Sequence, residues 1–271
     1  MPELPEVETT CRGIRPALVG HPVTGVVVRD PRLRVPVPSD LEAHVSGLVL
    51  RDVRRRAKYL LLDFDGGSLI VHLGMSGSLR VVSHDAPVGS HDHVDIVFGG
   101  QVLRLRDPRR FGLLTWQDGD PLAHPLLVSL GPEPLEPGFG GGWLHRVTRS
   151  LRAPIKQVLM DSRRVVGVGN IYASESLFRA RIHPLTPAGR IGLPRYRRLA
   201  DAIQETLTDA IRAGGSTLRD YVGGDGRAGY FQQQYFVYGR DGESCRVCAA
   251  PIERQVVAQR ATFWCPGCQH R

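Results

Sequence analysis

The chain has 271 residues, of which 42% are hydrophobic and 23% charged, and this composition excludes a wholly disordered or fibrous protein. No apolar run approaches the about 20 residues of a membrane-spanning helix, and the acidic, proline-containing start lacks a secretory signal. We therefore expect a cytoplasmic protein without a membrane partner. Lys and Arg outnumber Asp and Glu by 35 to 27, and the net charge of +8 indicates either an anionic partner such as nucleic acid or a generic basic surface, which charge alone does not separate.

The first half of the chain predicts one helix followed by short strands. Val7, Cys11, Ile14 and Leu18 recur at helical spacing, which predicts a helix over residues 5–19. Short apolar runs separated by glycine turns then predict an antiparallel sandwich or barrel. The expected strands are Val23–Val28, Tyr59–Phe64, Ser68–Leu73, His93–Phe98, Val102–Arg106 and Gly112–Trp116.

The second half predicts helices and a small cysteine-bearing tail. Residues 131–142 contain five glycines and three prolines, which indicates a linker and hinge. Helices are expected over 151–161, over 170–180 with Asn170 as the N-cap, and over 194–213. Residues 215–232 are rich in glycine and polar residues, which predicts a loop.

Two Cys-x2-Cys pairs lie near the end of the chain. The pairs are Cys245 with Cys248 and Cys265 with Cys268, and sixteen residues separate them. This spacing is typical of a structural zinc site with no open position for catalysis. Two disulfides are the alternative, which a cytoplasmic location disfavours, and an iron–sulfur cluster is a weaker one. A zinc-bound hairpin would carry Arg260 at or near its tip, either to bind phosphate or as a solvated surface charge.

The first residues offer a nucleophile. Met1 precedes the small residue Pro2 and is normally removed in such a context, which would expose the secondary amine of Pro2. Such an amine attacks aldehyde-like carbons, and Glu3 and Glu6 would lie beside it as acid–base groups. Most chains that begin Met-Pro make no use of the proline, so this motif alone is weak.

Lysine is rare in this chain. Only two of the 35 cationic residues are lysines, Lys58 and Lys156. Because an ammonium and a guanidinium are not interchangeable at a demanding site, these two positions are candidate functional sites unless they are retained by chance.

Several long and individually uncommon segments are spread from the first residue to the last. They are MPELPEVE at the start, RRAKYLLL at 55–62, HLGMSGSL at 72–79, HDHVD at 91–95, DPRRFG at 107–112, VVGVGNIYASESLF at 165–178 and QRATFWCPGCQ at 259–269. Together they resemble the formamidopyrimidine-DNA glycosylases, bacterial repair enzymes that remove oxidised purines such as 8-oxoguanine. The related endonuclease VIII branch shares the architecture, but Leu4 and the Val7-Glu8 continuation favour the formamidopyrimidine branch.

The resemblance implies an α+β multidomain fold. An amino-terminal catalytic domain of one helix and an antiparallel β-sandwich would span 1–130, and a hinge linker 131–149. A helix–two-turn–helix domain with a lesion-recognition loop would span 150–232, and a zinc-finger β-hairpin 233–271. The resemblance further implies one structural Zn²⁺, no organic cofactor, and a monomer that holds double-stranded DNA with oxidised purines in a basic cleft. The location would be the cytoplasm of a bacterium, in association with the nucleoid.

The resemblance also implies the catalytic residues Pro2, Glu3, Lys58 and Arg260. Pro2 would attack the sugar C1′, expel the damaged base and form a Schiff base, after which β- and δ-eliminations would cut the strand. Glu3 would protonate the sugar ring oxygen, and Lys58 would hold the phosphate next to the lesion. Arg260 would contact the DNA from the zinc hairpin, and Glu6 would support the geometry of the site.

A base can be excised from a duplex only after it is flipped out of the stack, which leaves a gap that a side chain fills. The resemblance assigns this role to Met75, Arg109 and Phe111, with Arg109 facing the orphaned cytosine. The alternative places Met75 and Phe111 in the core. Asn170 would bind a backbone phosphate at a helix start, and Lys156 would lie near the lesion.

His91 and His93 could form a metal pair, but no third ligand has suitable spacing, so DNA-facing or structural roles are favoured and His91 is assigned to DNA binding. Tyr238 is expected to be structural or near the active site. The loop at 216–230, which would cover the extruded base, has Arg219 where the family has lysine, with Tyr221 beside it. The exact lesion preference is therefore the least secure inference.

Two other functions compete with the glycosylase. A catalytically silent protein that binds damaged or regulatory DNA could use the same scaffold, but it would be expected to lose Pro2 or Glu3, and this chain has both. The same enzyme class could instead act on oxidised pyrimidines.

Overall fold

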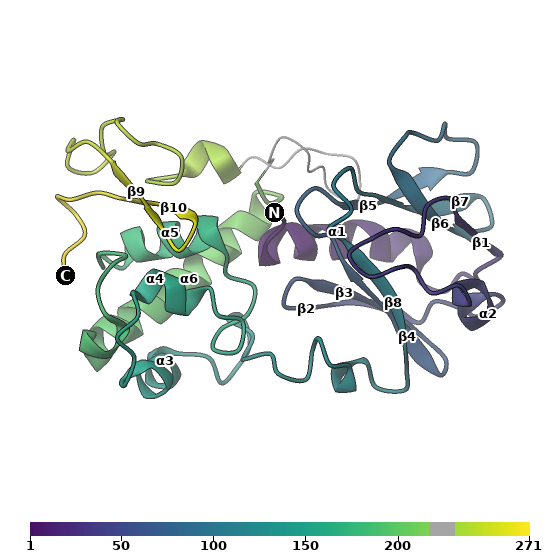
Figure 1. Cartoon of the computed structure of the whole chain (residues 1–271), viewed down its shortest axis with the longest axis horizontal. Coiled ribbons are helices and arrows are strands. Elements are labelled where there is room, and N and C mark those ends of the chain that lie inside the picture. Colours follow the sequence, from purple (N-terminus) through teal and green to yellow (C-terminus); the bar gives the residue numbers. More distant parts are fainter. Residues whose placement is uncertain (217–230) are drawn as a thin grey trace. The chain divides into compact units, whose positions relative to one another are not determined.

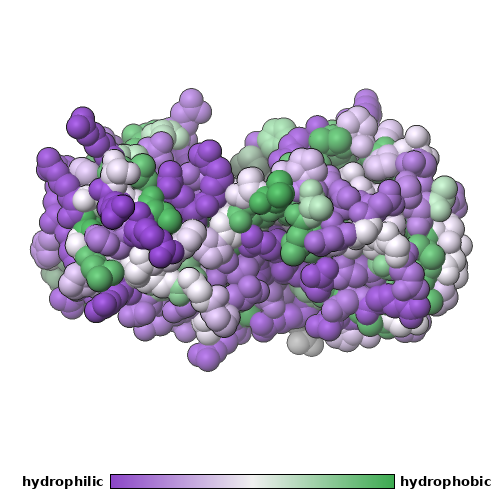
Figure 2. All heavy atoms as spheres, turned by 90° about the horizontal axis from the view of Figure 1, so that it is seen from below, coloured by the Kyte–Doolittle hydropathy of each residue, from purple (hydrophilic) through white to green (hydrophobic). Residues whose placement is uncertain are grey.

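The computed structural model describes residues 1–216 and 231–271, and these form two compact units (Figure 1). The amino-terminal unit consists of Met1–Ser129 with residues 213–216, and the helical unit consists of Leu130–Arg212 with Phe231–Arg271. In the described residues, no helix combines the length and the apolar character that crossing a membrane requires. The face of the molecule in Figure 2 is mostly hydrophilic, with hydrophobic residues in small groups.

The amino-terminal unit contains two four-stranded sheets, with strand orders β1-β6-β7-β5 and β2-β3-β4-β8. All their strand pairs are antiparallel. The strands are β1 Gly25–Val28, β2 Asp52–Arg56, β3 Tyr59–Phe64, β4 Gly67–His72, β5 Ser78–Ser83, β6 Asp92–Phe98, β7 Gln101–Arg106 and β8 Leu113–Asp118. Gly66, with φ 91°, and Gly99, with φ 66°, adopt the left-handed backbone that the short turns β3–β4 and β6–β7 require.

Helix α1 (Leu4–Leu18) shares the core of this sandwich. The four residues that define its helical period, Val7, Cys11, Ile14 and Leu18, are buried in one cluster with side chains from both sheets. Each buried side chain of this size stabilises the fold by about 1.5–3 kcal/mol relative to its exposed state. The packing of α1 against β2 and β5 therefore fixes the position of the first residues of the chain.

The helical unit is built around α6. Its helices are α3 Gly141–Thr148, α4 Ile155–Leu159, α5 Asn170–Arg179 and α6 Leu193–Arg212. Tyr196, Leu199, Ile203 and Leu207 of α6 are buried, as their spacing predicted, and α6 packs against α3 and α5.

A two-stranded hairpin completes the helical unit. Its strands are β9 Glu253–Val257 and β10 Arg260–Trp264. Ala258 and Gln259 in the turn have φ 47° and 61°, the left-handed pair of a tight hairpin. Phe263 of β10 lies in a small core with Phe178 of α5, so the hairpin packs against a helix and is not an isolated module.

The structure corrects several expectations. The helix expected over 151–161 is only the five-residue α4, since Pro154 restricts the residue before it to an extended backbone. Helix α3 lies inside the segment predicted as a linker, and α2 (Leu41–Val45), β2 and β5 were not expected. Strand β2 escaped prediction because Val53 is its only fully buried residue. Asn170 is the first residue of α5 and Gly169 is the N-cap.

The predicted recognition loop is described only at its first residue, Ser216. Arg219 and Tyr221 lie outside the described residues.

Candidate active site and metal centre

The first residues of the chain are enclosed by the amino-terminal unit. Pro2 is buried, and Glu3 and Glu6 are 2% and 0% exposed. Glu3 caps helix α1, and its backbone N–H donates to Glu6 Oε2 at 2.8 Å. The predicted nucleophile and both predicted carboxylates therefore lie together at the start of one rigid helix.

The amine at the chain start lies in an environment that favours its neutral form. Burial lowers the pKa of the Met1 amine below 8.0, Glu3 and Glu6 raise it, and Lys58 and Arg109 lower it again, with a net decrease. A lower pKa leaves more of an amine unprotonated near neutral pH, and only the unprotonated amine is a nucleophile. The electrostatic influence of Lys58 and Arg109 also shows that the structure brings these predicted residues close to the chain start.

Lys58 lies in the turn between β2 and β3, next to Ala57 with its left-handed φ of 55°. It is close to His72, a residue that the sequence reasoning missed. Burial, with the charges of Arg34 and Lys58, lowers the pKa of His72 to about 4. The neutral ring accepts a hydrogen bond at Nδ1 from the Gly74 N–H at 3.0 Å. His72 is the first residue of the motif HLGMSGSL, and this position in the motif could have identified it from the sequence.

Met75 and Phe111 are exposed, which excludes the core role that was the alternative for them. Met75 is 42% exposed and Phe111 is 45% exposed. The Arg109 guanidinium lies over the Phe111 ring, 4.9 Å from its centroid. Met75 lies in the turn before β5, and Arg109 and Phe111 lie in the turn between β7 and β8. The backbones of these two turns are in contact, since a Cβ added to Gly74 would lie 2.4 Å from the Phe111 carbonyl carbon.

Asp107 holds the second of these turns in place. Its carboxylate accepts hydrogen bonds from Ser76 Oγ at 2.8 Å, the Arg109 N–H at 3.2 Å and the Gly112 N–H at 2.7 Å. Its carbonyl oxygen lies 2.8 Å from Nε2 of His93, which is buried. His93 is therefore structural.

His91 is half-buried, and its backbone carbonyl accepts from the Asp107 N–H at 3.0 Å. In the described residues, the only group of ligand side chains placed to hold a metal is the four-cysteine cluster, which argues against a histidine metal pair.

In the helical unit, Asn170 lies beside Tyr238, with 3.5 Å between the Asn170 amide nitrogen and the Tyr238 hydroxyl. The side-chain oxygen of Asn170 is buried and has no hydrogen-bond partner in the described part of the chain. The oxygen and nitrogen of an amide are assigned from their surroundings. With the amide reversed, the Tyr238 hydroxyl would donate to the oxygen, and the NH₂ group would remain available for a ligand.

Glu175 positions Tyr238 and was also missed. Its buried carboxylate accepts the backbone N–H groups of Phe236, Val237 and Tyr238 at 2.9, 3.0 and 2.8 Å. Burial raises the pKa of Glu175, and the three N–H donors lower it by a smaller amount. The carboxyl group thus ties the segment before the zinc module to helix α5.

Lys156 and Arg260 meet at a cavity in the helical unit. Lys156 is 4% exposed and donates to the Ala261 carbonyl at 2.8 Å and to Thr262 Oγ1 at 2.9 Å. Arg260 is exposed at the hairpin turn, as predicted. Both residues line a cavity of about 280 Å³. Lys156 therefore joins α4 to the hairpin.

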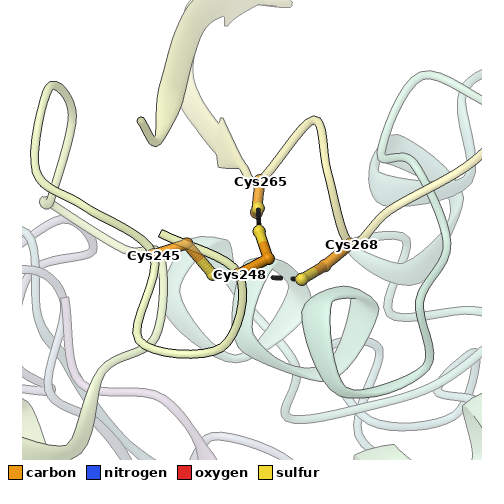
Figure 3. A group of neighbouring side chains, drawn as sticks. All are labelled: Cys245, Cys248, Cys265 and Cys268. Atoms are coloured by element: carbon orange, nitrogen blue, oxygen red, sulfur yellow. Dashed lines mark hydrogen bonds between the residues drawn. The ribbon is translucent and has the colours of Figure 1, made fainter. Parts of the chain in front are cut away.

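The four predicted ligands converge on one point from two loops (Figure 3). Their sulfur atoms lie within 4.8 Å of one another. A tetrahedral zinc with Zn–S bonds of about 2.3 Å holds its sulfurs about 3.8 Å apart. The residues thus fit one structural zinc ion, which closes the hairpin module. Cys11 lies in the sandwich core and is not part of the cluster.

Comparisons with known families agree with this architecture. The formamidopyrimidine-DNA glycosylase N-terminal domain matches residues 1–114, and the formamidopyrimidine-DNA glycosylase H2TH (helix–two-turn–helix) domain matches residues 130–222. The zinc finger found in FPG and IleRS matches residues 242–271. These matches define a DNA glycosylase with a zinc finger.

Full-length relatives give the same result. The formamidopyrimidine-DNA glycosylase of Aromatoleum aromaticum is 69% identical over 271 residues and is aligned over 100% of both chains. The MutM (Fpg) structure from Thermus thermophilus has a TM-score of 0.89 at 42% identity, over 99% of this chain and 98% of that one. Lactococcus lactis Fpg in complex with abasic-site DNA has a TM-score of 0.92 at 34% identity, over 99% and 100%. The chain belongs to the formamidopyrimidine-DNA glycosylase family, and it is a DNA-repair enzyme with a structural zinc.

Proposed function

We propose that this enzyme removes oxidised purines, such as 8-oxoguanine and formamidopyrimidines, from double-stranded DNA and then cleaves the strand. After removal of Met1, the lone pair of the Pro2 nitrogen attacks C1′ of the damaged nucleotide. The glycosidic bond breaks, its electrons leave with the base, and the base takes up the proton that the Pro2 nitrogen loses. A proton from Glu3 to the ring oxygen opens the sugar and yields the iminium form of the Schiff base.

Strand cleavage follows from the electron-withdrawing iminium. Loss of a proton from C2′ breaks the C3′–O bond in a β-elimination. Loss of a proton from C4′ then breaks the C5′–O bond in a δ-elimination. A carboxylate that has given up its proton can accept these protons in turn, and Glu3 is the closest candidate to the attacking nitrogen.

The observation that carries this proposal is the buried chain start, where Pro2 is enclosed beside the two buried carboxylates Glu3 and Glu6. An attacking amine must be uncharged, and burial at the chain start favours the uncharged form. Lys58 lies close enough to influence the amine and is suited to hold the phosphate next to the sugar under attack.

DNA binding is assigned to residues in both units. The exposed side chains of Met75 and Phe111, with Arg109 stacked on the latter, suit the filling of the gap left by a flipped base. Asn170 at the start of α5 suits a backbone phosphate. Lactococcus lactis Fpg has been solved in complex with DNA that contains Fapy-dG, which supports a damaged purine as the substrate proposed for this chain.

Zinc supplies stability to the module that carries Arg260 and no chemistry in the reaction. Four thiolate ligands leave the ion no open coordination position. The exposed guanidinium of Arg260 is suited to a DNA phosphate.

The test compares duplexes that contain 8-oxoguanine with duplexes that contain an oxidised pyrimidine, under single-turnover conditions. We expect excision of 8-oxoguanine to be faster and Glu3→Gln to slow it by at least about 100-fold. Glu8→Gln, a change on the same helix at a residue paired with Arg12 and Arg55, is the matched control. Faster excision of the pyrimidine, or equal effects of the two variants, would contradict the proposal.

A further inference from the structure

Glu6 joins two segments that are 210 positions apart in the sequence. Its carboxylate is fully buried. Oε2 accepts the Glu3 N–H at 2.8 Å, and Oε1 accepts the Ser216 N–H at 2.8 Å. Each oxygen therefore holds a different segment of the amino-terminal unit.

The turn that presents Ser216 is shaped to fit this carboxylate. Gly214 and Gly215 have φ of 76° and 79°, a left-handed pair that a chain with side chains rarely adopts. A Cβ on Gly215 would lie 3.3 Å from Glu6 Oε1 and 3.4 Å from Glu6 Cγ. The two glycines thus do more than end the preceding helix: they allow the backbone to approach Glu6 closely.

We propose that Glu6 is a positioning residue, which couples the 214–216 turn to the placement of the nucleophile at the chain start. This inference rests on the proposed function, because it assigns the nucleophile to Pro2. Glu3, whose N–H Glu6 holds, follows Pro2 directly. Ser216 directly precedes residues 217–230, the segment that the family resemblance expects to cover the extruded base. One carboxylate therefore links the 214–216 turn to the segment that carries the attacking amine.

The bridge requires a carboxylate. An amide at position 6 has one acceptor oxygen, so Glu6→Gln satisfies only one of the two N–H donors and turns an NH₂ group toward the other. Glu6→Asp is one methylene shorter and reaches only one of the two segments. A displacement of about 1 Å at the reacting atoms slows a reaction about 100-fold.

The test is a double-mutant cycle on the full chain, with the single-turnover rate of 8-oxoguanine excision as the readout. We expect Glu6→Gln and Gly215→Ala each to lower this rate by about 10- to 100-fold. The Kd for lesion DNA should stay within about threefold of the parent value, because the change lies in positioning and not in binding. If the bridge couples the two segments, the double variant is no slower than the slower single variant.

Matched controls separate positioning from general damage. Glu8→Gln changes a carboxylate on the same helix. Gly20→Ala introduces a side chain at φ 86° with no atom within 4 Å of the new Cβ, so it carries the backbone strain alone. Both controls should retain the parent rate within about twofold.

Rate reductions that multiply in the double variant would overturn the coupling, as would a loss of Kd equal to the loss of rate. If Gly215→Ala does not fold, amide hydrogen exchange at Ser216 gives a second test: faster exchange in Glu6→Gln than in Glu8→Gln supports the bridge, and equal exchange refutes it. Absence of excision by the parent chain would instead refute the proposed function.

Discussion

Gly74→Ala tests whether the two turns that present Met75 and Phe111 form one packed unit. Gly74 has φ 62°, and left-handed backbone costs an L-residue about 1–2 kcal/mol. A Cβ there would lie 2.4 Å from the Phe111 carbonyl carbon and 2.5 Å from the Gly112 nitrogen. Because backbone atoms cannot rotate away, overpacking adds about 1–3 kcal/mol. We expect a total loss of about 2–5 kcal/mol in the free energy of unfolding.

The control is Gly47→Ala, because Gly47 has φ 78° and no atom within 4 Å of a new Cβ. It should lose only the strain of about 1–2 kcal/mol. Urea unfolding of both variants, with excision assays on 8-oxoguanine DNA, measures the difference. Excision should fall about tenfold or more in Gly74→Ala alone, as the two turns separate. Equal stability losses in the two variants would refute the packing argument.

Three further predictions concern other parts of the molecule. Cys265→Ser should release the zinc and weaken DNA binding while the amino-terminal unit stays folded, whereas the control Cys11→Ser should retain zinc. Metal analysis and DNA-binding titrations measure both variants. Unchanged DNA affinity in Cys265→Ser would contradict the role of the hairpin. The pKa of His72 falls from 6.5 to about 4 on folding. Between these two pH values the unfolded chain binds a proton that the folded protein does not, so the free energy of unfolding is highest above pH 6.5 and decreases as the pH falls toward 4. Between pH 7 and 4.5 the loss is about 2 kcal/mol, and urea unfolding at these two pH values should show it in the parent but not in His72→Asn. Glu175→Gln should leave one buried N–H without an acceptor, reduce stability by about 1–3 kcal/mol and accelerate amide exchange at Tyr238; unchanged exchange would contradict its anchoring role.

The sequence predicted those elements whose side chains follow one clear period. Helices α1 and α6 have continuous apolar faces, and β3 has the predicted bounds. Strand β2 has the sequence DVRRR, in which four residues are charged and only Val53 is fully buried in the core. It exists because it pairs with β3 over five residue pairs, a tertiary interaction that local sequence does not encode.

The site was predictable where a motif carries its own chemistry. The zinc cysteines and the carboxylates beside the chain start were found from residue type and spacing. Asp107, Glu175 and the Glu6–Ser216 bridge were not, because each acts by accepting backbone N–H groups from segments that only the fold brings near. The N-cap of α5 was predicted at Asn170, one residue after its actual position at Gly169, because the cap depends on backbone geometry that the side chains do not encode.

Borohydride reduction during turnover tests the central claim most directly. The full chain is incubated with a duplex containing 8-oxoguanine, reduced, digested and analysed by mass spectrometry. The account predicts that Met1 is absent and that the DNA adduct maps to the nitrogen of Pro2. An adduct on Lys58 or another amine, or efficient excision by chains that retain Met1, would contradict it.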